Sequence, residues 1–280
     1  MKEVKQLEKI LGHSYGKIPK IKKRNIWNIY QDKLQTENYG LIKGFLEGIS
    51  YAIEQRFDKS KAFYNPATHT IFTPQKNNKL EEYAMYHELG HGYVNQINKS
   101  FLKITQEYCQ QQKEMLYNDK EISLALFEKY LIYLSIDEGL ADYLTIQAQK
   151  LDLNEGKRKL EEVICFKVES NLSNSPLIDK KTPIPLNHSS ISNLMMIGKS
   201  LIIMNGLFNG SNLLNKLKLL NTLNESLKKY PYFLGHYFVK TRLKNKSVNI
   251  GEKVDELIIN PPQNIDDMFN EIYLNLKNKI

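Results

Sequence analysis

The chain has 280 residues and a mass of 32.7 kDa, which is enough for one large domain or two small ones with a substantial core. Its apolar fraction of 41% and charged fraction of 25% are ordinary for a soluble globular protein. The formal net charge is +8, but the basic residues are scattered and mixed with acidic ones, whereas a nucleic-acid footprint should cluster on one face. We therefore expect no nucleic-acid partner.

Cysteine usage and hydropathy favour a reducing, aqueous compartment. Cys109 and Cys165 are the two cysteines, too few for disulfide bonds to stabilise a chain of this size. The first twenty residues are charged and lack an apolar run of signal-peptide length. The most apolar stretch, residues 194–207, is interrupted by Lys199 and is too short to cross a bilayer, so a buried helix is the better interpretation. A cytoplasmic location without membrane contact is predicted.

In chain order, the apolar spacing predicts a mainly helical chain with a short strand near residue 70. Residues 1–60 carry apolar residues at three- and four-residue intervals, which is typical of helices. Pro66 and Pro74 bracket a β-branched stretch at 67–73, which predicts a strand. The remaining expected elements are helices at 80–98, 122–150, 191–207, 212–228 and 231–244, a loop at 171–190, and a last short helix after Pro261 and Pro262.

The predicted fold class is therefore α+β and mainly helical. No composition shift forces a domain boundary, so residues 1–280 are expected to form one unit. Its parts are a helical N-terminal part at 1–60, a strand with two site helices at 61–150, and a helical C-terminal part at 151–280.

The sequence His87-Glu88-Leu89-Gly90-His91 indicates a metal site. On a helix, residues i and i+4 share a face, so both imidazoles can reach one Zn2+ ion. Glu88 can lean toward the open side of the ion and take a proton from bound water. The same pattern also occurs by chance, and two imidazoles do not complete a zinc site.

Glu138 is the candidate third ligand. It follows His91 by 47 positions (138 − 91), enough for a helix, a turn and a returning helix. Asp142 lies one turn further on the same face and can accept the outward N–H of a ligating histidine. The small Gly139 and Ala141 allow close packing against the histidine helix. The alternative is that both acids lie on a solvated helix face.

HELGH followed by DEGLAD resembles the gluzincin branch of zinc metallopeptidases, of the thermolysin and aminopeptidase-N kind. The resemblance implies a zincin-like catalytic domain with a small sheet packed on the HExxH helix. It implies that His87, His91 and Glu138 bind one zinc ion and that Glu88 is the general base. It also implies that Asp142 is an outer carboxylate, which holds a ligand histidine without touching the metal. Peptide or protein substrates follow from it.

A later stretch, Tyr230-Pro-Tyr-Phe-Leu-Gly-His236, is similar to a helix start of the aminopeptidase-N branch. The resemblance implies that Tyr232 donates a hydrogen bond to the developing oxyanion. The alternative for Tyr232 is ordinary packing. His236, one turn on, either faces the same cleft or packs as a structural histidine. The resemblance also implies that the strand at 68–73 is an edge that lines the cleft. Within it, His69 fits a strand residue better than a metal ligand, because three ligands and a water already complete the site.

The chain departs from the family in two respects. It has no G-x-M-E-N stretch, so amino-terminal trimming is not implied. The spacing from His91 to Glu138 is long and requires an extra helical segment at about 101–120. The alternative function is a non-catalytic zincin-fold binding or regulatory protein, against which Glu88 counts because a structural site needs no base.

Overall fold

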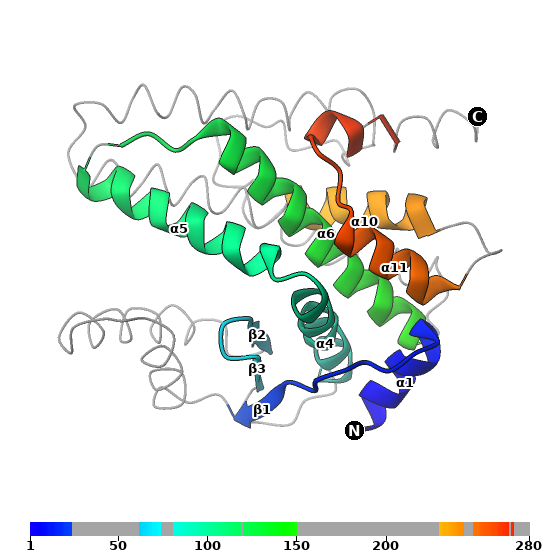
Figure 1. Ribbon diagram of the computed structural model, residues 1–280. Coiled ribbons are helices and arrows are strands. Elements are labelled where there is room, and N and C mark those ends of the chain that lie inside the picture. Colours follow the sequence, from blue (N-terminus) through cyan, green and yellow to red (C-terminus); the bar gives the residue numbers. More distant parts are fainter. Residues whose placement is uncertain are drawn as a thin grey trace, which may run out of the picture.

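The computed structural model describes residues 1–23, 62–73, 81–118, 120–149, 230–243, 249–268 and 270–271. The predicted elements at 171–190, 191–207 and 212–228 lie outside these residues, as do residues 24–61. The described part is α+β and mainly helical, as predicted, with a sheet of three strands (Figure 1). In chain order its elements are α1 Lys2–Leu11, β1 Lys20–Lys23, β2 Phe63–Asn65, β3 Thr70–Thr73, α4 Glu81–Ile97, α5 Ser100–Asn118, α6 Leu124–Ala148, α10 Tyr230–Leu243 and α11 Ile250–Ile259.

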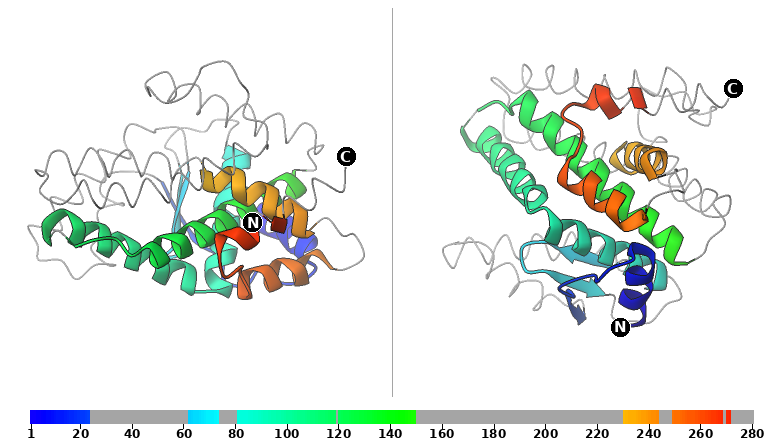
Figure 2. Two further views of the ribbon diagram at one scale, coloured as in Figure 1. Left: turned by 90° about the horizontal axis from the view of Figure 1, so that it is seen from above. Right: turned by 45° about the vertical axis from the view of Figure 1, so that its right-hand side comes forward.

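Helix α6 is the central helix of the described residues. Its residues are buried on nearly every side, because α1, α4, α5 and α10 all pack against it. Figure 2 shows the strands gathered beside α4, with α1 near the C-terminal end of α6, where Gln6 donates a hydrogen bond to the Ala148 carbonyl. Ser123 caps the start of α6 by accepting a hydrogen bond from the Leu126 N–H.

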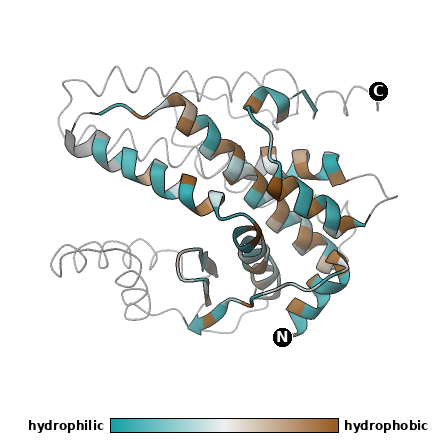
Figure 3. Ribbon diagram, in the orientation of Figure 1, coloured by the Kyte–Doolittle hydropathy of each residue, from teal (hydrophilic) through white to brown (hydrophobic). Residues whose placement is uncertain are grey.

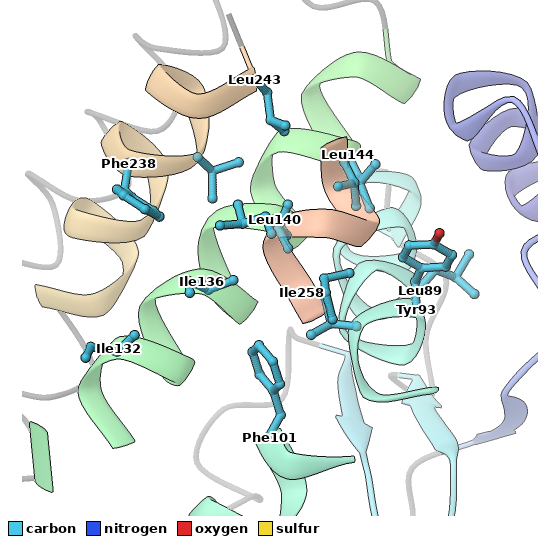
Figure 4. Close-up of a cluster of buried hydrophobic side chains, with 14 of the residues drawn as sticks. Leu89, Tyr93, Phe101, Ile132, Ile136, Leu140, Leu144, Phe238, Leu243 and Ile258 are labelled. Carbon is cyan, nitrogen blue, oxygen red and sulfur yellow. The ribbon is translucent and has the colours of Figure 1, made fainter. Parts of the chain in front are cut away.

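The main apolar core lies where α4, α6, α10 and α11 meet. Ile136 and Leu140 of α6 pack there with Phe238 of α10, Ile258 of α11 and Leu89 of α4, each at most 1% exposed (Figure 4). Burying one such side chain contributes roughly 1.5–3 kcal/mol. Hydrophobic residues concentrate on these facing surfaces, whereas α5 is largely hydrophilic (Figure 3). This core holds the two site helices in a fixed relation.

The crossing of α6 and α10 depends on two glycines. A Cβ on Gly235 of α10 would lie 1.8 Å from the Ser135 carbonyl oxygen, and one on Gly139 would lie 2.3 Å from the Gly235 oxygen. The prediction that Gly139 and Ala141 both face the histidine helix is therefore half correct. Ala141 packs against Gly90 of α4, but Gly139 packs against α10.

We expect Gly235→Ala to destabilise the fold by about 1–3 kcal/mol or more, because the added methyl group meets backbone that cannot rotate away. The free energy of unfolding, measured with urea, checks this, with Thr241→Ala on the same helix as the control. A Gly235→Ala protein as stable as the control would contradict the close crossing.

Residues 12–23 correct the expectation of a helical N-terminal part. Gly12, in a left-handed conformation at φ 75°, ends α1, and the chain continues as a loop into β1. The loop is tied to α4, because the Tyr15 hydroxyl donates to the Leu89 carbonyl at 2.6 Å and the Gln96 side chain binds backbone groups of Tyr15 and Lys17 at 2.8 Å.

The sheet has the order β1-β3-β2, with β1 parallel and β2 antiparallel to β3. The expectation of an edge strand at 68–73 is therefore wrong. Residues 66–69 form a turn, and β3 is the central strand of the three described. The sheet does pack on α4, as predicted, through β2 and β3. Among the described residues, no helix has the length and apolarity that a membrane span requires.

Candidate metal centre

The predicted site residues lie on α4 and α6, which pack closely at one point. A Cβ on Gly90 would lie 2.6 Å from the Ala141 Cα atom, so only glycine permits this approach. His87 contacts Glu138 and Asp142, whereas His91 contacts Asp137 and Glu138. Higher numbers on one helix thus pair with lower numbers on the other, and the two helices run antiparallel at the site.

Three ligand atoms converge, as the sequence predicted. The Nε2 atoms of His87 and His91 lie 3.1 Å apart, and the Glu138 Oε2 atom lies 3.2 Å from the first and 3.5 Å from the second. All three side chains are almost buried, at 10–12% exposure. Within the described ranges, these three residues form the group able to hold a metal ion.

Each histidine is held from outside by a carboxylate. Asp142 Oδ1 lies 3.0 Å from His87 Nδ1, which matches the predicted role of Asp142. Asp137 Oδ2 lies 3.0 Å from His91 Nδ1, a role that the sequence interpretation missed. The sequence did offer one indication, because Asp137 directly precedes Glu138 and so lies on the neighbouring face of the same helix. With a proton on each Nδ1 beside its carboxylate, each Nε2 has a lone pair available to a metal ion.

This arrangement fits a metal ion. Glu138 Oε2 is buried without a hydrogen-bond donor, and it faces two imidazole lone pairs. Only a cation, or protons added to the imidazoles, can supply positive charge between these atoms. Ligand atoms at about 2.0–2.1 Å from a tetrahedral zinc ion lie about 3.3 Å from one another, which is the spacing found here. His87, His91 and Glu138 therefore suit one divalent cation.

The electrostatics of the imidazoles agree with cation binding. Burial lowers the pKa of both histidines, but the carboxylates outweigh it. Asp142 and Glu138 raise the pKa of His87 well above its ordinary value, and Asp137 and Glu138 raise that of His91 to about 9. The site therefore attracts protons when it holds no metal, and a metal ion that binds there must displace them.

Glu88 lies beside this group, buried on α4. Burial raises the pKa of its carboxyl group, while the neighbouring His91 and His87 act in the opposite direction. A carboxylate with a raised pKa is a stronger base than one in water, which suits proton transfer near neutral pH.

The remaining candidates have different outcomes. Tyr232 lies in the first turn of α10 after Pro231, as predicted, but its side chain is outside the described part of the chain. His236 is buried on α10, where its ring packs edge-on against Tyr237 at 5.6 Å, and it is not a member of the metal-binding group. His69 lies in the turn at 66–69 and not in a strand, so that expectation is wrong, and its two nitrogens contact the Tyr64 hydroxyl and the Lys17 carbonyl.

We expect Asp137→Asn to weaken zinc binding about 10- to 100-fold, because the amide holds the ring of His91 without the negative charge. Competition with a chromophoric chelator measures the dissociation constant, with the exposed Asp266→Asn as the control. If the two variants bound zinc with equal affinity, Asp137 would have no role in zinc binding.

Comparisons of the chain with known protein families, with curated proteins and with solved structures gave no significant match.

Proposed function

We propose that this chain is a zinc-dependent metallopeptidase with a single zincin-like catalytic unit. One observation carries the proposal: three ligand atoms of His87, His91 and Glu138 converge while a buried acid, Glu88, stands beside them. A site that served stability alone has no use for a buried acid next to its ligands. Peptides or unfolded proteins are the proposed substrates.

In the proposed hydrolysis, different residues bind the metal, orient its ligands and transfer the proton. His87, His91 and Glu138 would hold the zinc ion, and Asp142 and Asp137 would fix the two ring planes. A zinc ion held there would lower the pKa of a bound water toward neutrality and polarise the substrate carbonyl. Glu88 takes the proton of the attacking water and passes it to the leaving amine. Tyr232 is proposed to donate a hydrogen bond to the carbonyl oxygen as negative charge develops there.

The test is hydrolysis that depends on metal. The purified protein with one equivalent of zinc should cleave casein or a mixed peptide library, lose this activity with a chelator, and regain it when zinc returns. Stoichiometric zinc binding without any cleavage would support the alternative, a non-catalytic zincin-fold binding protein. A protein that binds no zinc would refute both.

A further inference from the structure

The turn of α4 that carries the ligand His91 has a glycine on each side of that residue. Glycine in the interior of a helix is destabilising relative to alanine, so both positions need a reason. Gly90 has one in the close approach of α6. A Cβ on Gly92 would lie 2.7 Å from the Tyr15 hydroxyl oxygen and 2.9 Å from Pro19 Cγ. Gly92 therefore makes room for the N-terminal loop, residues 12–19, which runs past α4 between α1 and β1 (Figure 1).

Tyr15 also binds the backbone of α4 between the two ligand histidines. Its hydroxyl donates a hydrogen bond to the Leu89 carbonyl oxygen at 2.6 Å, and this contact is buried. The orientation of the peptide unit that begins at Leu89 helps to set how far apart the imidazoles of His87 and His91 lie. Gly90 follows directly, and glycine restricts the backbone least of all residues. A carbonyl bound to a buried hydroxyl cannot rotate without losing that hydrogen bond.

The backbone of Tyr15 is fixed as well. Its N–H donates to Glu8 Oε1 at 3.1 Å, and its carbonyl oxygen accepts from Gln96 Nε2 at 2.8 Å. Gln96 Oε1 accepts from the Lys17 N–H at 2.8 Å, so one side chain of α4 holds two residues of the loop. The buried ring of Tyr15 packs beside that of Tyr93, with centroids 5.7 Å apart. The hydroxyl thus reaches α4 from a loop that α4 itself holds.

We propose that docking of the N-terminal loop is coupled to zinc binding, and that Tyr15 is a positioning residue for the ligand histidines. The docked loop holds the turn from His87 to His91 in the geometry in which both imidazoles meet Glu138. Coupling between two sites is reciprocal, so bound zinc also holds the loop on α4. The proposal rests on the metal centre of the proposed function and does not depend on peptide hydrolysis.

Zinc affinity tests the role of the Tyr15 hydroxyl. Tyr15→Phe removes only this group, and we expect the dissociation constant for zinc to rise about 3- to 10-fold. Tyr108→Phe on α5 is the matched control, because it removes a buried hydroxyl that accepts from Gln112 outside the metal-binding group. Each variant loses one hydrogen bond, so a purely structural role would leave both with the zinc affinity of wild type. That result for Tyr15→Phe would refute the positioning role.

Hydrogen exchange tests the reciprocal effect in the unaltered protein. The amides of Lys17 and Ser123 are matched, since each is exposed and donates to a glutamine Oε1 atom, at 2.8 and 2.9 Å. We expect saturating zinc to slow exchange of the Lys17 amide at least threefold more than that of Ser123. An equal response of the two amides would overturn the coupling. If zinc binds but no peptide is cleaved, the peptidase function fails, while both experiments still decide the coupling.

Discussion

Glu88→Gln is expected to lower kcat about 10²–10⁴-fold while the protein keeps one zinc ion per chain. Glutamine has the same size as glutamate and keeps an oxygen that can accept a hydrogen bond, so the side chain should stay in place. What it loses is the ability to take a proton. Because the ligands His87, His91 and Glu138 are unchanged, metal affinity should change little. Single-turnover hydrolysis of a fluorogenic peptide, together with zinc analysis of the same sample, measures both quantities.

The exposed Glu107→Gln on α5 is the matched control, since it makes the same chemical change outside the metal-binding group. It should behave as wild type. If Glu88→Gln cleaved at the wild-type rate, a different group would have to be the base. If it lost zinc as well as activity, Glu88 would act on the metal rather than on the water.

The site could be predicted from sequence largely because helical periodicity is local. His87 and His91 are one turn apart, as are Glu138 and Asp142, so each pair appears on one face before any packing is known. Both residues of the second pair do meet the histidines. Asp137 was missed because it adjoins Glu138 and lies off the stripe that i, i+4 spacing selects. Only the antiparallel packing of α4 on α6 shows that this neighbouring stripe faces His91.

The sheet was harder to predict than the site, because its strands pair with residues far away in the sequence. The four residues of β1 include a single apolar residue and carry no alternation that would indicate a strand. Lys20 pairs with Thr70, and the order β1-β3-β2 depends on that distant contact. The partner of Gly139 was misassigned for the same reason, since α10 begins at Tyr230 and no short-range pattern joins it to α6.

Glu138→Gln should remove most zinc binding, with a larger effect than the 10- to 100-fold expected for the outer carboxylates. In the wild-type protein, Glu138 Oε2 lies 3.2 Å from His87 Nε2 and 3.5 Å from His91 Nε2. An amide has no charge, and its NH2 group can donate to an imidazole Nε2 and occupy the place of the ion. Glu138→Gln should therefore fold normally without metal. After dialysis, zinc should fall from about one ion per chain to almost none.

Thermal unfolding separates loss of a ligand from damage to the fold. Zinc at 100 times its dissociation constant should stabilise wild type by about 2.7 kcal/mol and raise its Tm, whereas Glu138→Gln should gain little at the same concentration. In a chelator Glu138→Gln should unfold somewhat below wild type, because the protonated imidazoles lose a carboxylate partner, so the quantity to compare is the gain in Tm on adding zinc. The gain in Tm that zinc gives Asp137→Asn should lie between the gains of wild type and Glu138→Gln. If Glu138→Gln kept its zinc and its stabilisation, the third ligand would lie elsewhere, and the convergence of α4 and α6 would have a different purpose.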